Sequence, residues 1–449
     1  MKNFIAIVSL LTLAGNAGAL EWHARGPRAL GMGGAGVALA QGPLASYWNP
    51  AALGRSSANS YGVQVPLGAH VALTGTVYEG MKDLQALRDR GTAPSQPEID
   101  AALAKLNQPG NGLRLDGDFG VDSRFGKFGV FLNGTSDVGA QPVIDNVNKT
   151  APQIQNGSNN SKLVVKGANI GELGVAYGHE LPFAQGLYVG GALKIMSADV
   201  GYADYFILRD DSNQNDIVSK LKNGARKSSN VGVDAAALWD VDRSFGGVAL
   251  KPKVGLVGRN LNNPKFKNPG TATTAGHGDS FTVNPQIRLG LALTPFGWWN
   301  IAADVDLTRN LTPVDNAASR QLGVGSEFNV FNRAWLNIPL RIGLRRNLAE
   351  ASAGTMLTAG AGLNFLHVML DASAAVSNRR VSTSANEKIP REVALGFQLS
   401  MLFGGAEEKA PEPVADNQPV PTEKVREASD KAQEDLKVEE LKKSAPAKP

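Results

Sequence analysis

The sequence predicts an all-β protein: a transmembrane antiparallel β-barrel of about 14 strands with an N-terminal hatch, or plug, inside the lumen. Three observations favour this class. Apolar and polar residues alternate along segments of mostly 9 to 14 residues, short and long connections follow one another, and the chain begins with an export signal. A soluble sandwich would show the same alternation, but its strands usually have about five or six residues. A tilted membrane strand needs about 9 to 11.

The composition excludes several function classes. The 449 residues suffice for roughly two or three soluble domains or one large barrel. The absence of cysteine excludes disulfides and thiolate metal sites, and a formal charge of +4 is too small for this length to indicate nucleic acid. The five histidines lack metal-ligand spacing, and neither a nucleophile elbow nor a spaced carboxylate pair is present. We therefore expect no enzyme activity, no metal and no cofactor.

Residues 1–19 are predicted to be a signal peptide. Lys2 precedes the apolar run FIAIVSLLTLA, and Ala17-Gly18-Ala19 has the small-x-small pattern of a cleavage site. The run is too short to remain as a membrane-spanning helix. The alternative is an N-terminal core helix. We expect the mature chain to begin near Leu20, outside the cytoplasm.

Residues 20–57 are predicted to form the hatch. The stretch RALGMGGAGVALA has the Gly-x-Gly-x-x-Gly spacing of a dinucleotide-binding turn, but a polar segment precedes it and the first acidic residue after Gly36 is Glu79. A nucleotide site needs a preceding strand and a carboxylate about 20 residues further on. Small residues instead allow close backbone packing. The expected hatch residues are Gly31, Gly33, Gly34, Gly36, Tyr47, Trp48, Asn49, Pro50 and Ala51.

Residues 58–403 are predicted to form the barrel. The expected strands are 58–66, 69–78, 112–122, 127–136, 168–179, 186–199, 229–240, 247–260, 283–294, 298–308, 318–330, 336–346, 355–364, 367–376 and 391–403. Only Leu67 and Gly68 separate the first two, which we take as one bent strand. The total is then fourteen, and bacterial barrels have even numbers. The last strand ends on an aromatic residue, Phe403, as outer-membrane barrels tend to do.

Charged residues that alternate with the apolar positions are expected to face the lumen. They either line a pathway, brace the hatch, or pair among themselves as in any polar barrel interior. These residues are Glu172, Lys251, Lys253, Asp304, Asp306, Arg341 and Arg345, together with Arg259 and Glu180.

Two further segments lie outside this pattern. Residues 79–109 have helical spacing and are expected to form an outer loop, either over the barrel mouth or simply at the surface. Residues 404–449 hold many charges and prolines but no aromatic residue, so this tail cannot bury enough apolar area to fold alone. We expect it in the periplasm, mostly disordered or helical, as a solvated tail or as a tether for a periplasmic protein partner.

The stretch ARGPRALGMGGAGVALAQGPLASYWNPAAL, ending in Asn49-Pro50-Ala51, resembles the N-terminal hatch of FadL-like outer-membrane proteins. That superfamily includes fatty acid and toluene transporters, PorV-type secretion proteins and proteins named conjugal transfer protein TraF. The sequences of the hatch and the charged tail are most similar to those of the TraF-named branch. The resemblance implies a fourteen-stranded barrel in the outer membrane of a Gram-negative bacterium.

For function, the resemblance implies a passive channel for hydrophobic small molecules such as long-chain fatty acids. The ligand would bind near the outer mouth, move the hatch and leave sideways into the membrane lipid. The alternative is a structural or docking component of a conjugal transfer or secretion apparatus.

Overall fold

The computed structural model describes residues 20–55, 60–90, 94–208, 220–221, 223–315, 317–333, 335–350, 354–382 and 388–403. The expected signal peptide and tail, residues 1–19 and 404–449, lie outside this described part. None of its helices is long and apolar enough to cross a membrane.

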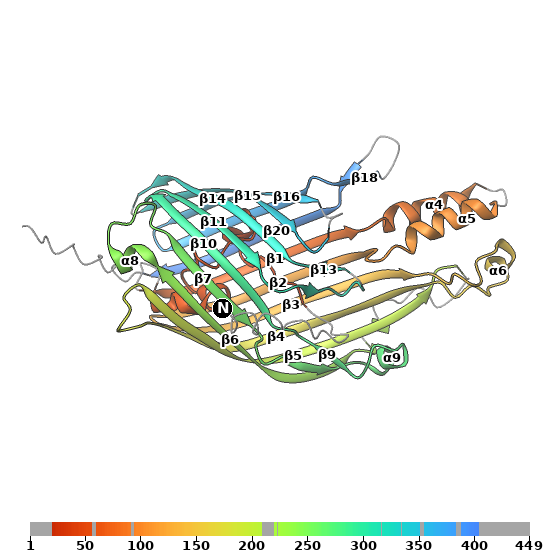
Figure 1. Ribbon diagram of the computed structural model, residues 1–449, viewed down its shortest axis with the longest axis horizontal. Helices are drawn as coiled ribbons and strands as arrows, with labels where there is room; N and C mark the ends of the chain where they lie inside the picture. The colour runs from red at the N-terminus through yellow and green to blue at the C-terminus, as the bar shows by residue number, and fades with distance from the viewer. Residues whose placement is uncertain are drawn as a thin grey trace, which may run out of the picture. The chain divides into compact units, whose positions relative to one another are not determined.

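Fourteen antiparallel strands close into a barrel (Figure 1). In order around the barrel they are β1 (Tyr61–Thr74), β2 (Gly112–Phe125), β3 (Phe128–Val143), β4 (Lys162–Glu180), β5 (Leu187–Phe206), β6 (Arg226–Asp240), β7 (Lys253–Arg259), β10 (Gln286–Phe296), β11 (Trp299–Asp306), β14 (Gln321–Asn332), β15 (Leu336–Asn347), β16 (Thr355–Phe365), β17 (Val368–Ser377) and β20 (Glu392–Phe403). β1 pairs with β20 from Tyr61 opposite Phe403 to Ala72 opposite Glu392. The predicted fold class and strand number are confirmed, and β1 is one strand across Leu67 and Gly68.

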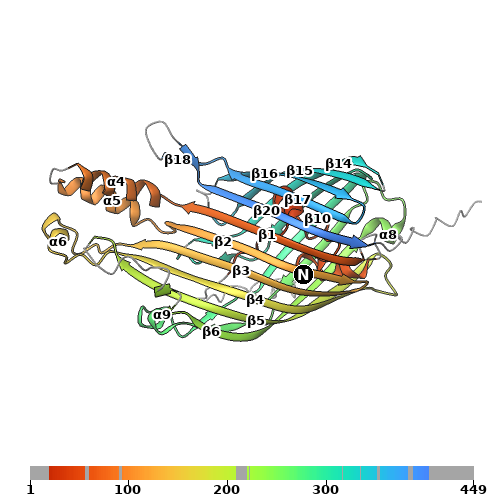
Figure 2. The ribbon, with the colours of Figure 1, turned by 180° about the vertical axis from the view of Figure 1, so that it is seen from behind.

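The connections differ between the two ends of the barrel. One end has short turns and α8 (Val241–Phe245), and the other carries the long loops (Figure 2). These loops hold α4 (Val77–Asp89), α5 (Gln96–Leu106), α6 (Ala151–Gln155) and α9 (Gly270–Thr274). They also hold three hairpins: β8 (Lys265–Lys267) with β9 (Ser280–Thr282), β12 (Asn310–Leu311) with β13 (Ala318–Ser319), and β18 (Arg380–Ser382) with β19 (Lys388–Pro390). Figure 1 shows α4 and α5 beyond the ends of β1 and β2, rather than across the lumen.

The outward face of the wall is apolar and exposed. On β15, Leu340, Ile342 and Leu344 are 44%, 62% and 49% exposed, whereas Arg341 and Arg345, at alternating positions, point inward and are buried. A closed sheet satisfies every backbone hydrogen bond within the wall, so it can lie in hydrocarbon. An apolar outer face on a closed barrel is that of an outer-membrane protein.

Aromatic side chains gather at the short-turn end. The rings of Phe296 and Trp298 stack with centroids 5.5 Å apart, and those of Trp299 and Phe328 with centroids 5.8 Å apart. Aromatic girdles mark the membrane–water interface in such barrels. Short turns face the periplasm in this class, which places the long loops outside the cell.

The strands β3, β4 and β5 are longer than the sequence pattern predicts. Their pairing continues to Val143 opposite Lys162 and to Lys162 opposite Phe206. Glycine and lysine in this stretch interrupt the alternation, as in Lys166-Gly167, so the sequence pattern indicates a loop. The antiparallel backbone pairing persists because it needs no apolar side chains.

Candidate functional site

The N-terminal segment, residues 20–55, lies inside the barrel, and we call it the inner segment. It contains α2 (Pro27–Gly31), α3 (Ala45–Trp48) and the 3₁₀ helix η2 (Pro50–Gly54), and nearly all of it is buried. α2 packs against β15, β16, β17 and β20, and η2 packs against β4, β5 and β6. The segment therefore contacts opposite walls, and it lies toward the short-turn end (Figure 1).

Glycines of the wall bring the two backbones together. A Cβ atom added to Gly325 would lie under 3.0 Å from backbone atoms of Met32, and one added to Gly343 equally close to the nitrogen of Gly33. Gly33 has φ of 73°, which favours glycine, and its own Cβ would lie under 3.0 Å from the carbonyl oxygen of Leu344. Side chains at these positions would push the inner segment off the wall.

The other glycines expected in the hatch lie in the same region. Gly31 approaches Gly360 of β16, where an added Cβ would lie 3.2 Å from its Cα. Gly34 has φ of 89°, and an added Cβ at Gly36 would lie 2.7 Å from the ring of Trp48. The Gly-x-Gly-x-x-Gly spacing thus serves close packing inside a barrel.

Inward carboxylates of the wall hold the backbone and side chains of the inner segment. Asp304 of β11 accepts hydrogen bonds from the backbone N–H groups of Gly36 at 2.8 Å and Val37 at 2.9 Å. Glu327 of β14 accepts two from the guanidinium of Arg28, at 2.9 and 2.7 Å. Bonds to charged acceptors are stronger than those between neutral groups. These two strands therefore hold the first half of the segment.

A hydroxyl of β16 adds a third attachment. Thr358 Oγ1 accepts a hydrogen bond from the backbone N–H of Gly33 at 3.0 Å and donates one to the carbonyl of Gly31 at 2.9 Å. The hydroxyl therefore connects two backbone groups at the end of α2 with the wall.

Alternate residues at the start of the inner segment form ion pairs with the wall. The pairs are Glu21 with Arg114 (2.5 Å), His23 with Asp137 (3.1 Å) and Arg25 with Asp118 (3.1 Å), and Arg345 also pairs with Glu21. Burial would raise the pKa of Glu21, but Arg114 and Arg345 hold it well below its usual range. Burial lowers the pKa of His23, but the Asp137 carboxylate raises it, to about 9. Both groups are therefore charged at neutral pH.

Aromatic rings of the inner segment stack with arginines of the wall. Trp22 and Trp48 stack at 6.4 Å, and Tyr47 meets Trp48 edge-on at 5.5 Å. Arg288 lies 4.6 Å from the ring of Trp22, and Arg259 lies 4.3 Å from the ring of Tyr47. Such cation–π contacts strengthen when water is excluded.

The Asn-Pro-Ala motif holds the second half of the inner segment. Asn49 is fully buried; its Oδ1 accepts from the N–H of Ala51 at 3.1 Å, which caps η2. Its Nδ2 donates to the carbonyls of Val37 at 3.1 Å and Ala237 of β6 at 3.3 Å. Pro50 opens η2. One amide thus connects the two halves of the segment with the wall.

The structure places most of the expected lumen residues inside the barrel. Seven of them are Glu172, Lys253, Arg259, Asp304, Asp306, Arg341 and Arg345. Glu172 pairs with Lys194 and Arg259, Asp306 with Arg288, and Arg341 with Glu327 and Asp371. Among the described residues, Asp304 and Arg345 of these seven form hydrogen bonds with the inner segment, and Arg259 contacts it through the ring of Tyr47.

Two of the expected lumen residues lie elsewhere. Lys251 is exposed in the turn before β7, with φ of 43°, because this strand begins only at Lys253. The expectation that Lys251 faces the lumen is therefore wrong. Glu180 lies at the end of β4 and pairs with Arg243 of α8 at 2.6 Å, so it stabilises the periplasmic turns.

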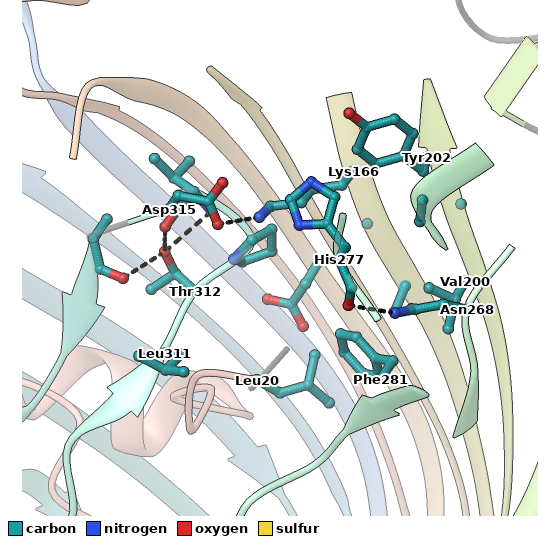
Figure 3. Close-up of a pocket in the computed structure, with 18 of the residues that line it drawn as sticks. Leu20, Lys166, Val200, Tyr202, Asn268, His277, Phe281, Leu311, Thr312 and Asp315 are labelled. Carbon is teal, nitrogen blue, oxygen red and sulfur yellow. Dashed lines mark hydrogen bonds and ion pairs between the residues drawn. The ribbon is translucent and has the colours of Figure 1, made fainter. Parts of the chain in front are cut away.

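A cavity of about 640 Å³ lies between the outer loops and the start of the inner segment. Its apolar side includes Leu20, Phe281 and Leu311, and its polar side includes Tyr202, His277 and the Lys166–Asp315 ion pair (Figure 3). Burial lowers the pKa of His277, and the nearby Lys166 lowers it further. The cavity is therefore amphipathic. Within the described residues no group of three or more His, Asp or Glu side chains is arranged to hold a metal.

The chain matches the sequence model of the family described as F plasmid transfer operon, TraF, protein over residues 46–306. It is also similar to the solved toluene transporter TodX of P. putida (11% identity, 85% of this chain and 99% of that chain, TM-score 0.46). Others are the monoaromatic hydrocarbon channel CymD (12%, 85% and 98%, 0.44) and a Pseudomonas aeruginosa FadL homologue (12%, 86% and 99%, 0.41). No curated protein sequence matches it.

Proposed function

We propose that this chain, which belongs to the family described as F plasmid transfer operon, TraF, protein, is an outer-membrane channel for hydrophobic small molecules, because a closed barrel holds a cavity beside the inner segment. The match agrees with the resemblance to the TraF-named branch. The proposed cargo is a long-chain fatty acid or a molecule of similar amphipathic character, which enters from outside the cell. Passage needs no energy input.

The observation that carries this proposal is the amphipathic cavity that ends on the inner segment. Leu20, the first described residue of the segment, lines its apolar side, and Asp137 lines it while pairing with His23. A ligand pocket is commonly apolar with a few placed polar groups. A molecule bound here would touch the residues that begin the inner segment. Ligand and hatch are thus adjacent, as a ligand-moved hatch requires.

The test is uptake of a labelled long-chain fatty acid by cells that lack their own transporter and express this protein. In one variant, Ala168→Trp fills the cavity, since Ala168 is a buried lining residue. In the control, Ala303→Trp places the same ring on the outward face of β11. A third variant, Asn49→Ala with Pro50→Ala, loosens the second half of the inner segment. We expect saturable uptake that Ala168→Trp abolishes, Ala303→Trp leaves unchanged and the double variant alters.

Uptake that is equal in the Ala168→Trp and Ala303→Trp variants would contradict passage through this cavity. Repeating the assay with labelled toluene separates a fatty acid channel from one for aromatic hydrocarbons. Insertion of every variant is checked by its heat-modifiable migration in outer-membrane fractions.

A second function is suggested by the family description, which names a transfer operon. In it, the barrel anchors a transfer or secretion apparatus, and the tail 404–449 binds a periplasmic protein. Deleting residues 408–449 would then abolish transfer but leave uptake and barrel insertion intact. If the Ala168→Trp variant loses uptake but retains transfer, this result would favour the channel.

A further inference from the structure

Three exposed arginines lie at the outer rim of one wall. Arg320 precedes β14, Arg346 is near the end of β15, and Arg379 follows β17. Within the described residues, none of the three forms an ion pair with a carboxylate; the guanidinium of Arg320 donates a hydrogen bond to the backbone carbonyl of Asp306, at 3.0 Å. We call these three residues the arginine rim. Three guanidiniums without carboxylate partners leave a concentrated positive charge at one place.

The strand register brings the three side chains together. Leu322 of β14 lies opposite Arg346, and the N–H of Leu348 donates to the carbonyl of Arg320 at 2.7 Å. Arg320 and Arg346 are therefore diagonal neighbours, which lie roughly 7–8 Å apart on a sheet. Arg346 lies opposite Thr355 of β16. Arg379 lies at the start of β16, the strand next to that of Arg346, where a Cβ atom added to Gly354 would lie 2.7 Å from its Cγ.

The arginine rim lies directly above a lipid-facing surface. On β15 the outward residues are Leu340, Ile342 and Leu344, and the next outward position is Arg346. On β16, Leu357 is 60% exposed and lies two residues from the strand end that faces Arg346. The change from apolar side chains to guanidiniums along these strands therefore coincides with the boundary between the acyl chains and the headgroups of the outer leaflet.

The opposite wall combines basic residues with an acidic one. At the outer end of β5 and β6, the exposed Asp199 lies opposite the exposed Lys227 in the strand register. The outward residues before them on β5 and β6 include Ser197 and Ser229, which are uncharged. Exposed basic residues also occur on the opposite wall, at Arg226, Lys227, Lys265 and Lys267. The arginine rim is therefore distinguished by having no carboxylate opposite it in the register and by the apolar surface directly below it.

We propose that the arginine rim binds the phosphate groups of a lipid A-type phosphoglycolipid in the outer leaflet. Guanidinium forms paired hydrogen bonds with phosphate oxygens and is weakly hydrated, which suits it to a membrane interface. The acyl chains of the same lipid lie along the apolar columns below. The assignment rests on the proposed outer-membrane orientation, in which the long loops face outside, but it does not depend on transport.

The test compares lipid retained by the full-length protein after mild detergent extraction, measured by native mass spectrometry. The rim variant is Arg320→Gln with Arg346→Gln. The control, Arg226→Gln with Lys227→Gln, removes the same charge at the same end of the opposite wall. Each protein is titrated with diphosphorylated lipid A and with the same lipid after its phosphates are removed. We expect at least a tenfold loss of lipid A binding in the rim variant and less than a twofold change in the control.

Three results would overturn the proposal. They are equal binding of the dephosphorylated lipid, equal loss in both variants, or complete displacement of lipid A by millimolar inorganic phosphate, which would indicate a site for free phosphate. Fatty acid uptake is measured on the same proteins. Lipid A retention without uptake would refute the channel and leave the arginine rim standing, and uptake with unchanged lipid binding in the rim variant would do the reverse.

Discussion

Replacing Asp304 by alanine should release the middle of the inner segment. The Asp304 carboxylate accepts two backbone hydrogen bonds, from Gly36 and Val37. A hydrogen bond to a charged group contributes about 1.5–3 kcal/mol, so local opening should become easier by about 3–6 kcal/mol. Each 1.4 kcal/mol is about a tenfold change in an equilibrium, so the two amides should exchange at least about 100-fold faster.

Hydrogen exchange of the detergent-solubilised barrel, read by mass spectrometry on peptides covering residues 31–44, measures this opening. Asp304→Asn is the matched variant. It keeps an oxygen where the two N–H groups point, and its amide would occupy the place of Asp304 Oδ1, which has no hydrogen-bond partner. The asparagine variant should exchange faster than the wild type but more slowly than Asp304→Ala, because its neutral oxygen still accepts both bonds, each weaker than a bond to a carboxylate. Exchange in Asp304→Ala within threefold of the wild type would refute the view that this carboxylate holds the segment.

Three further predictions concern the same interface. Gly33→Ala should expose the inner segment to added protease, because φ of 73° and the nearby carbonyl of Leu344 both exclude a Cβ; alanine at Gly246, which has open space around it and a similar φ, isolates the backbone cost. The ion pair between His23 and Asp137 stabilises the inner segment on the wall; this contribution is full below pH 6.5, the ordinary histidine value, and should disappear as pH rises through about 9. Tryptophan fluorescence should change over the same pH range, and His23→Gln should remove this pH dependence. Arg288→Met should cost about 3–5 kcal/mol in urea unfolding because it leaves Asp306 buried without its partner, and adding Asp306→Leu should restore most of that.

The barrel could be predicted because its wall lies between two solvents. Lipid outside and polar groups inside require a period of two, and the sequence of β15 carries it without interruption. The sequence pattern did not predict the strands correctly in the parts of the barrel that lie outside the membrane, where alternation is not required. The outer extensions of β3 to β5 lie beyond the apolar band, where neither face contacts lipid. Their residues therefore do not alternate between apolar and polar although the strands are paired. Lys251 was misplaced because alternation alone does not mark where a turn ends.

The attachments of the inner segment were only partly predictable. Alternation places Asp304 and Arg345 inside, but it does not say which inward charge meets the segment and which meets another wall residue. Glu327 alternates in the same way on β14 and was missed among the polar inward positions. Thr358 carries no charge, so no sequence signal distinguishes it from other small polar residues facing the lumen. Such pairings depend on barrel diameter and strand stagger, which a list of strands does not contain.

The attachments also differ in how much each part of the inner segment resists movement. Around Gly33 the backbone lies on wall glycines and is held by Thr358, so displacement would break packing that no ligand replaces. Around Asn49 a fully buried amide and η2 hold the second half against β4 to β6. Residues 20–25 are held by ion pairs and by the buried ring of Trp22, and water entering with a ligand can solvate both partners of the ion pairs. Leu20 is the one residue of the inner segment among the described residues that line the cavity, so a bound ligand would contact the segment first at this end. A channel in this barrel would open from the outer end of the inner segment, with the part around Gly33 staying in place.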